Sequence, residues 1–518
     1  MVPKIDHDNL RNRLLEVIKK EVKWIPAAGE ERISAMVELR PDWCLSRQRY
    51  WGVPIPAVVC ADCKEEFLAS DVIRKFAKLA ETEGSDAWFT RDLKDFLPAG
   101  FKCPHCAKTN FTKGNDILDV WFDSGVSSQA VLKKRKELQF PSQLYLEGSD
   151  QHRGWFQSSI IPAMCIDGKP PFNNVLTHGF VVDGDGRKMS KSLGNVISPF
   201  DIIKDYGADI LRLWVASSDY NEDIRISKEI LARLSEAYRK IRNTVRFILS
   251  NLKDFDPNTN KISFKDLMSL DKWILLKLDQ SLCGPATNAY NEFRFHEAFK
   301  IIYSFCNEEL SMDYLDMVKG RLYTSAANSV ERRAAQTVMY EALNVLVRVM
   351  APILTFTAEE IWQHMPKEAA DASAPSVHLL EWPESKAKFW EEEYRRDLSK
   401  YDSLSWALKL RVEVNKELEE KRSAGLIGSS FDARINILTK DQIRYTYLDS
   451  LKADLTEIFK VSQVTLGCSA AHPDIAVAVA KADGAKCTRC WNYSEKVGQS
   501  AAHPILCDRC LEAIGEEK

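Results

Sequence analysis

The sequence predicts an α/β region, then a mostly α-helical region, and finally a small α/β region that ends in a zinc knuckle. Three observations support this fold class. Residues 41–217 are short apolar runs separated by glycine, proline and aspartate, which is typical of strands bounded by turns. From Ser227, apolar residues recur at helical spacing for about 150 residues. Residues 487–510 contain two Cys-x-x-Cys pairs, a spacing typical of zinc sites.

Composition and the lengths of the apolar stretches argue against a disordered, secreted or membrane-spanning chain. The sequence is 45% apolar and 28% charged, as in globular proteins, and its 518 residues suffice for several domains of ~150 residues. The net charge of −3 does not indicate a nucleic-acid partner, although a large enzyme can confine its basic surface to one stripe. No signal-peptide pattern is present, and the longest apolar stretch, residues 342–354, is too short to span a bilayer. We therefore expect a cytoplasmic protein. A monomer is expected, although no pattern in the sequence determines the oligomeric state.

The first elements follow from local patterns. In residues 1–40, Leu10, Leu14 and Ile18 recur at helical spacing, which predicts a helical lead-in. Residues 143–146 and 174–182 are apolar runs bounded by turn residues and predict strands.

The helical region begins with residues 228–253, whose apolar stripe is flanked by basic side chains. This basic line is either a solvated helix face or a contact with RNA. Thr357-Ala-Glu-Glu360 is a capping-box pattern and predicts the start of another helix at Thr357. A loop or linker at 366–377 precedes a late helix with Leu404 and Leu408 on one face, and runs near 435–438 and 461–466 predict the small α/β unit. The basic residues around the first stripe are Arg233, Arg239, Lys240, Arg242 and Arg246.

Eight of the thirteen cysteines form four Cys-x-x-Cys pairs. Thiolates so spaced suit tetrahedral zinc, whereas a disulfide framework would suit a short secreted chain. Cys487 and Cys490 are separated by sixteen residues from Cys507 and Cys510, which predicts a zinc knuckle. The other group is a weaker candidate because thirty-nine residues separate its pairs. We expect one zinc ion, and two if this second group also binds. Its members are Cys60, Cys63, Cys103 and Cys106.

The segment Lys188-Met-Ser-Lys-Ser192 follows a strand-like run and a glycine-rich turn at Gly184 and Gly186. Two ammonium groups on a loop suit a reaction that builds negative charge on a phosphate and on departing pyrophosphate. The pentapeptide alone could equally be an exposed basic loop. It is not a P-loop, since the sequence has no Gly-x4-Gly-Lys-Ser/Thr pattern.

Longer strings narrow the interpretation. They are Arg40-Pro-Asp-Trp-Cys-Leu-Ser-Arg-Gln-Arg-Tyr-Trp-Gly, Asp119-Val-Trp-Phe-Asp-Ser-Gly125 and Leu146-Glu-Gly-Ser-Asp-Gln-His-Arg-Gly-Trp-Phe156. With the lysine loop, they resemble the bacterial-type isoleucyl-tRNA synthetases, which are class I enzymes, over about residues 20–518. The resemblance implies that the α/β region is the C-terminal half of a Rossmann-type catalytic domain.

The resemblance also implies domain boundaries. Residues 1–40 would be a lead-in from an editing-domain junction, and 41–226 the catalytic half, with a zinc ribbon inserted at about 57–115. Residues 227–385 would form an anticodon-binding bundle, 386–480 a junction α/β region, and 481–518 the zinc-knuckle tail.

Residue roles follow from the same resemblance. Lys188 and Lys191 would be catalytic and bind ATP together with Ser190. His178 would lie beside the adenine-binding strand, although a structural role is equally open. The residues expected to hold the aminoacyl-adenylate are Glu147, Gly148, Asp150, Gln151, Trp155 and Trp51.

The implied function is ATP-dependent activation of L-isoleucine, with Mg²⁺, and transfer to tRNA(Ile). One family signature, His-x-Gly-His, does not occur in the sequence, and only about forty residues precede the Arg40 string, where the family has an editing domain. We therefore expect a truncated or split form, inactive without a separate N-terminal half. The alternative is a non-catalytic tRNA-binding protein derived from a synthetase.

Overall fold

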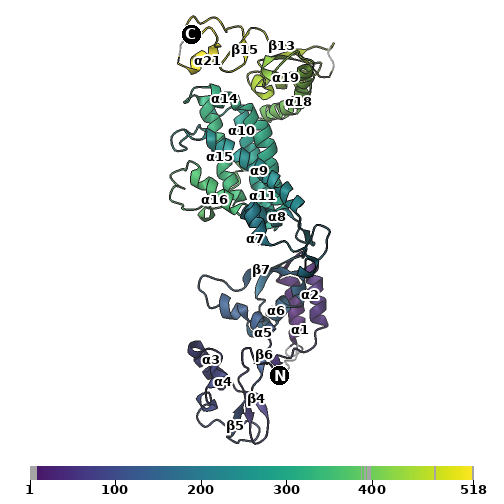
Figure 1. Cartoon of the computed structure of the whole chain (residues 1–518), viewed down its shortest axis with the longest axis vertical. Helices are drawn as coiled ribbons and strands as arrows, with labels where there is room; N and C mark the ends of the chain where they lie inside the picture. The colour runs from purple at the N-terminus through teal and green to yellow at the C-terminus, as the bar shows by residue number, and fades with distance from the viewer. Residues whose placement is uncertain (1–8, 387, 390–391, 394–397, 472–473, 516–518) are drawn as a thin grey trace. The chain divides into compact units, whose positions relative to one another are not determined.

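The computed structural model describes residues 9–386, 388–389, 392–393, 398–471 and 474–515, and it divides into two compact units (Figure 1). Unit 1 contains residues up to Val181 and the segment Tyr220–Ile224. Unit 2 contains Val182–Asp219 and the chain from Arg225 onward. The division between the units falls inside the range 41–226 that was predicted to be one catalytic region, and the predicted domain boundaries stay predictions.

Unit 1 is built on a parallel three-stranded sheet in the order β1-β8-β7. Its strands are β1 (Lys23–Ile25), β7 (Ser142–Gly148) and β8 (Phe172–His178). Helices α1 (Leu10–Lys20), α2 (Ala28–Glu38) and α6 (Trp155–Ile166) bury Leu14, Ile33 and Phe156 in one core with Tyr145 and Phe172 of the sheet. A parallel sheet needs helical cover because its strands are buried. The α/β class predicted for this region is therefore confirmed.

A small ribbon lies between α2 and the sheet strand β7 in the sequence. Its antiparallel sheet, in the order β4-β3-β5, packs with α3 around Val58, Val72, Trp88 and Phe96. The elements are β2 (Ser46–Arg47), β3 (Ala57–Cys60), β4 (Glu66–Leu68), α3 (Ser70–Glu83), α4 (Ala87–Thr90), η2 (Leu93–Asp95), β5 (Phe111–Lys113), β6 (Ile117–Leu118), α5 (Val120–Gly125) and η3 (Ser128–Leu132).

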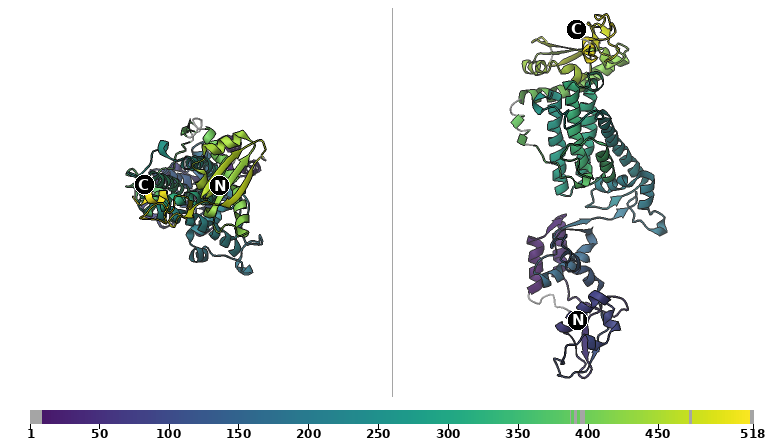
Figure 2. Two further views of the ribbon diagram at one scale, coloured as in Figure 1. Left: turned by 90° about the horizontal axis from the view of Figure 1, so that it is seen from above. Right: turned by 90° about the vertical axis from the view of Figure 1, so that its left-hand side faces the viewer.

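Unit 2 is largely a helical bundle, whose helices run side by side in the right-hand view of Figure 2. Helix α15 is buried almost all round, including Leu343 and Val347, because its neighbours surround it. The elements up to the bundle's end are β9 (Val181–Val182), η5 (Lys191–Leu193), α7 (Pro199–Tyr206), α8 (Ala208–Ser217), β10 (Ile224–Arg225), α9 (Lys228–Asn251), η6 (Phe264–Asp266), α10 (Ser269–Lys277), η7 (Leu278–Cys283), α11 (Gly284–Asn291), α12 (Phe295–Ser304), η8 (Phe305–Tyr314), α13 (Leu315–Met317), α14 (Lys319–Thr324), α15 (Val330–Met350), α16 (Thr355–His364) and η9 (Val377–Leu379).

The start predicted for one bundle helix is wrong. Helix α16 begins at Thr355 rather than at Thr357. The free backbone amides of its first turn are satisfied by another helix, since Asp209 of α8 accepts hydrogen bonds from the Thr357 amide (2.7 Å) and from the Phe356 amide (3.2 Å). A cap supplied from elsewhere in the fold leaves no local sequence pattern.

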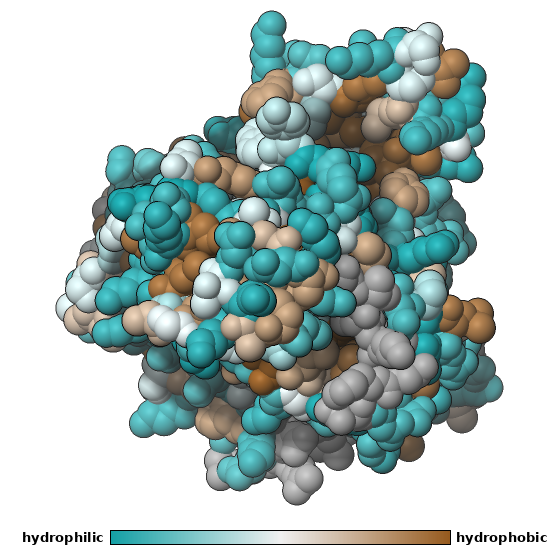
Figure 3. Space-filling model, turned by 90° about the horizontal axis from the view of Figure 1, so that it is seen from below, coloured by the Kyte–Doolittle hydropathy of each residue, from teal (hydrophilic) through white to brown (hydrophobic). Residues whose placement is uncertain are grey.

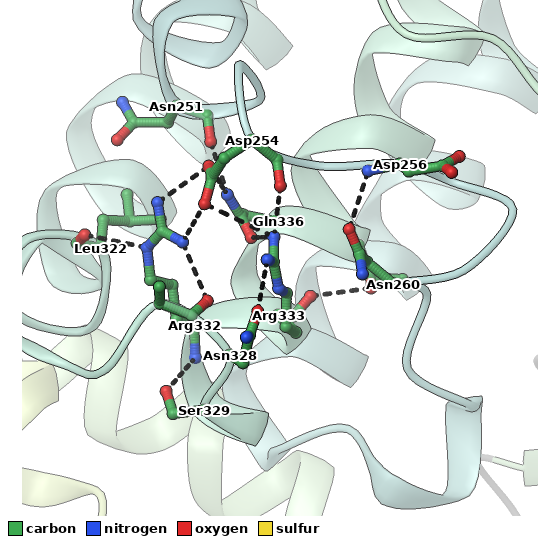
Figure 4. Close-up of polar contacts among 12 residues, drawn as sticks. Asn251, Asp254, Asp256, Asn260, Leu322, Asn328, Ser329, Arg332, Arg333 and Gln336 are labelled. Atoms are coloured by element: carbon green, nitrogen blue, oxygen red, sulfur yellow. Dashed lines mark hydrogen bonds and ion pairs between the residues drawn. The ribbon is translucent and has the colours of Figure 1, made fainter. Parts of the chain in front are cut away.

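A polar cluster fixes the loop after α9 to the start of α15 (Figure 4). The Asp254 carboxylate accepts hydrogen bonds from the Arg332 guanidinium at 2.5 and 2.9 Å and from Gln336 Nε2 at 2.9 Å. The Arg333 guanidinium donates to the Asp254 carbonyl at 2.8 Å. Hydrogen bonding from Arg332 lowers the pKa of Asp254 to about 2. The cluster thus ties two helices through one loop carboxylate.

The last part of unit 2 is the small α/β unit predicted from the sequence. Its sheet has the order β12-β11-β13, with β12 parallel and β13 antiparallel to β11, and its strands lie side by side in the left-hand view of Figure 2. The elements are α18 (Leu398–Ser423), η10 (Ser430–Asp432), β11 (Ala433–Thr439), α19 (Gln442–Ser450), α20 (Leu455–Phe459), β12 (Gln463–Cys468), β13 (Ala476–Lys481), β14 (Ala485–Lys486), β15 (Tyr493–Ser494) and α21 (Asp508–Ala513).

The surface seen from below is mainly hydrophilic, with apolar side chains in separate groups (Figure 3). Within the described part of the chain, no helix combines the length and apolar character that crossing a membrane requires.

Candidate active site and metal centres

The carboxyl ends of β7 and β8 bring together three residues that the sequence singled out. In the parallel pairing, Gly148 lies opposite His178, and the preceding residue Glu147 lies opposite Thr177. Ligands of open α/β sheets bind outside the carboxyl ends of the strands. A Cβ atom at Gly148 would lie 2.7 Å from Asp150 Oδ1, so glycine allows the Asp150 carboxylate to approach this strand end, and His178 Cε1 lies 3.9 Å from the same position.

The turn η4 (Ser149–His152) orients the two polar residues that follow β7. Gln151 Oε1 accepts a hydrogen bond from the Trp155 amide at 2.9 Å, and Gln151 Nε2 donates to Asp150 Oδ2 at 3.1 Å. His152 is buried and its ring stacks on Trp24, and burial lowers its pKa. Gln151 therefore caps α6 and fixes Asp150, while the neutral His152 anchors the turn in the core.

A hollow of about 390 Å³ opens beside the start of α6. Among the predicted adenylate residues, Asp150 and Gln151 line it. Trp155 is not in the lining: its ring stacks on Tyr145 with the centroids 4.1 Å apart, and its Nε1 donates to the Ser124 carbonyl at 3.1 Å. The complete lining is Arg40, Trp43, Asp119, Trp121, Asp150, Gln151, Arg153, Gly154 and Ser158.

Trp51 is not part of this lining, and its side chain is 94% exposed. The indoles on the hollow belong to Trp43 and Trp121, and Trp121 Cη2 lies 3.1 Å from the place of a Cβ on Gly154. Trp121 stands in the Asp119 string, but no local signal distinguishes an indole that packs on a glycine from one buried in the core. The role of Trp51 stays a prediction.

Three further residues of the hollow, Asp119, Trp43 and Arg40, were assigned no role from the sequence. Asp119 is buried and accepts hydrogen bonds from Arg47 Nη2 at 2.7 Å and from Trp43 Nε1 at 3.0 Å. The Arg40 guanidinium lies over the Trp43 ring, 5.2 Å from its centroid. Burial, together with the nearby Arg153, lowers the pKa of Arg40. The Arg40 and Asp119 strings contain this charge pairing, but only the fold brings the two strings together.

The lysine loop belongs to unit 2. Lys188 and Lys191 are exposed, and neither makes an ion pair among the residues that the structure describes. Ser190 Oγ accepts a hydrogen bond from the Leu193 amide at 3.3 Å, so this hydroxyl caps the short helix η5. The two ammonium groups are thus free to meet an anionic ligand.

Both cysteine groups have the geometry of a tetrahedral metal site. In each, the four sulfur atoms all lie within 4.8 Å of one another. The separations are 3.6 Å for Cys60–Cys106, 3.7 Å for Cys63–Cys103 and 3.6 Å for Cys490–Cys507. Four thiolates ~2.3 Å from zinc stand roughly 3.8 Å apart, whereas a disulfide would need about 2.05 Å. Four thiolate donors of this spacing fit Zn²⁺ in both groups.

The C-terminal group is the more enclosed of the two. All four of its cysteines are buried, whereas Cys63 and Cys106 of the other group are half-buried. The Cys507 amide donates to Cys487 Sγ at 3.4 Å, and Arg489 donates to the Thr324 carbonyl at the end of α14. Folding of the knuckle therefore also sets its attachment to the bundle.

Comparison with known proteins matches the features described above to one class of enzyme. Residues 4–227 match the tRNA synthetases class I (I, L, M and V), residues 271–437 match the anticodon-binding domain of tRNA ligase, and residues 484–513 match the zinc finger found in FPG and IleRS. Residues 4–227 thus match the class I tRNA synthetases, as the sequence strings predicted.

Within that class, the chain is similar to isoleucine–tRNA ligases. It is 48% identical over 517 residues to the enzyme of Syntrophotalea carbinolica, covering 98% of this chain and 54% of the relative. It is 46% identical over 518 residues to the enzyme of Thermotoga petrophila, covering 99% of this chain and 55% of the relative. The chain thus spans about half the length of the curated relatives it matches.

A solved structure supports the fold. Mycobacterium tuberculosis methionyl-tRNA synthetase in complex with methionyl-adenylate matches with a TM-score of 0.50 at 19% identity, over 71% of this chain and 64% of that one.

Proposed function

We propose that this chain supplies the C-terminal part of the active site and the tRNA-binding region of an isoleucine–tRNA ligase. The observation that carries the proposal is that nearly the whole chain is 48% identical to an isoleucine–tRNA ligase. The meeting of Gly148 and His178 at the carboxyl ends of two parallel strands supports a nucleotide site there. A cytoplasmic location and a monomeric state stay predictions.

The proposed reaction has two steps. A carboxylate oxygen of L-isoleucine attacks the α-phosphorus of ATP, and the bond to the β-phosphate oxygen breaks, which gives isoleucyl-adenylate and pyrophosphate. The terminal ribose hydroxyl of tRNA(Ile) then attacks the acyl carbon, and AMP leaves. Mg²⁺ bound with ATP neutralises part of the triphosphate charge.

The residues of the chain have separate roles in this proposal. Carboxylates of Glu147 and Asp150 accept hydrogen bonds from ribose hydroxyls or from the substrate ammonium group, and Gln151 holds Asp150 in place. Lys188 and Lys191 stabilise the charge that develops on the α-phosphate and on pyrophosphate.

The remaining assignments concern the pocket walls and the nucleotide. Trp155 and Trp51 are proposed to be walls of the amino-acid pocket. Trp121 on the hollow is a further wall candidate, with an indole that is 44% exposed. His178 and Ser190 are proposed to lie next to ATP.

A separate N-terminal half is the proposed partner in catalysis. In the described sheet, β7 is an edge strand, and Leu146 on it is 50% exposed. An exposed edge strand readily pairs with another strand. We expect the partner to add its strand beside β7.

A groove of about 650 Å³ between α9 and α16 supports a contact with tRNA. Arg242, Arg246 and Lys253 line it, are exposed, and make no ion pair among the described residues. Arg239, one turn before Arg242, is instead paired with Glu236 at 2.5 Å. Unpaired guanidinium groups one helical turn apart suit successive phosphates of an RNA backbone.

The test of this surface is the affinity for tRNA(Ile) at several salt concentrations. Arg242→Ala with Arg246→Ala should weaken binding roughly tenfold or more, and should lower the salt dependence by about one released ion for each phosphate that the variant no longer binds. Arg239→Ala is the matched control, because that arginine already has a carboxylate partner. Equal affinity of the double variant and the unmodified chain would rule out the groove as a tRNA contact.

The alternative function is a non-catalytic tRNA-binding protein. It needs only the regions that match the anticodon-binding domain and the zinc finger, and no amino-acid activation. Both functions predict tRNA binding, so only amino-acid activation in the presence of an N-terminal half separates them.

A further inference from the structure

Asn195 makes three hydrogen bonds that close the lysine loop onto its own base. Asn195 Oδ1 accepts from the Ser190 amide at 2.9 Å. Its Nδ2 donates to the Lys188 carbonyl at 3.3 Å and to Asp183 Oδ2 at 2.8 Å. The backbone on both sides of Met189 is therefore held by one amide side chain. Gly194, at φ +64° with no atom within 4 Å of its Cβ position, turns the chain so that Asn195 points back.

Asp183 determines which way this amide faces. It is buried at the end of β9 and also accepts hydrogen bonds from the Arg187 amide (2.8 Å), Arg187 Nε (3.1 Å) and the Asp185 amide (3.1 Å). Hydrogen bonding from Asn195 lowers the pKa of Asp183 to about 2. Because a carboxylate only accepts hydrogen bonds, Asn195 must turn its NH₂ group toward Asp183 and its carbonyl toward Ser190.

The lysines themselves lack such restraints. The described hydrogen bonds of the loop involve its backbone and serine hydroxyls, while the Lys188 and Lys191 side chains are exposed. The position of the two ammonium groups therefore depends on the backbone that Asn195 holds.

We infer that Asn195, oriented by Asp183, is a positioning residue that latches the lysine loop in the arrangement needed for activation. The latch is a property of unit 2 alone, whereas its effect on the reaction rests on the proposed function. A lysine displaced by about 1 Å loses much of its effect on a transition state, so the latch should matter more for kcat than for the KM of ATP.

The first experiment measures the loop in the full 518-residue chain, without activity. In Asn195→Ala, hydrogen–deuterium exchange of residues 188–195 should speed up by roughly tenfold or more, because the variant removes all three hydrogen bonds and one alone corresponds to about this factor. Trypsin should also cleave faster after Lys188 and Lys191. The matched control is Asn415→Ala, an exposed asparagine on α18. Exchange within twofold of the unmodified chain would overturn the inference.

A second variant, Asn195→Asp, should make the exchange rate of the loop depend on pH, which a mere loss of packing would not do. Asn195→Asp brings two carboxylates to hydrogen-bonding distance, and such a pair binds one proton with a raised pKa. The other charged groups at Asp183 are Arg187, Asp185 and, beside Gly186, Arg225. The measured quantity is the ratio of the exchange rate in Asn195→Asp to that of the unmodified chain at the same pH. This ratio should be high at pH 8 and should approach one near pH 5, where the pair of carboxylates gains its proton. A ratio that does not change with pH would count against the orienting role of Asp183.

The third experiment concerns the reaction. With an N-terminal half of an isoleucine–tRNA ligase added, Asn195→Ala should lower kcat of isoleucine-dependent ATP–pyrophosphate exchange by about 100-fold with little change in KM. A loosened loop with unchanged kcat would overturn the positioning role. No exchange even with the unmodified chain would instead refute the proposed function, and the loop measurements would still decide whether the latch exists.

Discussion

Gly125 ends α5 where the backbone of α6 passes too close for any side chain. A Cβ at this residue would lie 2.0 Å from the Ser158 carbonyl oxygen and 2.7 Å from its carbon. Since backbone atoms cannot rotate away, Gly125→Ala must separate the two helices.

We predict that Gly125→Ala lowers the free energy of unfolding of unit 1 by about 3 kcal/mol, as overpacking does. Urea unfolding measures this. Gly320→Ala, with no atom within 4 Å of its Cβ position, is the control and should be neutral or slightly stabilising. Similar midpoints for both variants would refute the close approach.

The sequence predicted some residues of the candidate site and not others. Asp150 and Gln151 were predicted because they stand in a long family string, and both line the hollow. No spacing rule predicts that Gln151 caps α6. Trp121 and Arg40 escaped notice because residues 40 and 121 meet only through the fold. Asn195 lies three residues after the lysine loop, and no sequence pattern assigns it a role, since its three hydrogen-bond partners are identified only by distance.

At the scale of elements, the joint between α9 and α15 depends on the ionised Asp254. Its folded pKa of about 2 lies below the unfolded value of about 3.9. Its contribution to stability is therefore complete above about pH 4 and is lost as the pH falls toward 2. Because the Asp254 side chain is 45% exposed, we predict a loss of only about 1 kcal/mol for Asp254→Asn at pH 7. Asp86→Asn, at an exposed site, is the control.

The measurement is urea unfolding of both variants between pH 7 and pH 3. The difference between Asp254→Asn and the unmodified chain should shrink as the pH is lowered. A difference that stays constant or grows on acidification would show that Arg332 does not stabilise the ionised carboxylate.

The two cysteine groups give a prediction about metal content. The unmodified chain should contain two equivalents of zinc, since both sets of sulfurs have tetrahedral spacing. Cys507→Ser should remove one equivalent and make residues 481–515 sensitive to protease, because a zinc knuckle has almost no core of its own. Mass spectrometry of the metal measures the content. Cys468→Ser, outside both groups, should change nothing. A Cys507→Ser chain with its full zinc content would contradict the assignment.

For the whole molecule, hydrophobic periodicity was enough to predict the order of an α/β region, a helical region and a small α/β unit. Residues such as Leu14 and Ile18 carry that pattern because one face of each helix is buried. The resemblance predicted a ribbon inserted at about 57–115, but its individual strands and helices, and the division between Val181 and Val182, were not predicted. Both depend on contacts between residues distant in sequence, which no local window contains.

We propose that Lys188 and Lys191 are catalytic lysines of an isoleucine–tRNA ligase and that this chain cannot activate isoleucine by itself. Positioning of the triphosphate between two groups of residues supplies much of the rate, ~7–11 kcal/mol for well-oriented reactants. The chain contains the lysine loop and no His-x-Gly-His string. Both parts of the site should therefore be needed.

The most direct measurement is isoleucine-dependent ATP–pyrophosphate exchange with this chain alone, and then with a separately prepared N-terminal half of an isoleucine–tRNA ligase. We expect no exchange by the chain alone, exchange on mixing, and its loss when the mixture contains Lys191→Ala. Exchange by the chain alone, or undiminished exchange with Lys191→Ala, would contradict it.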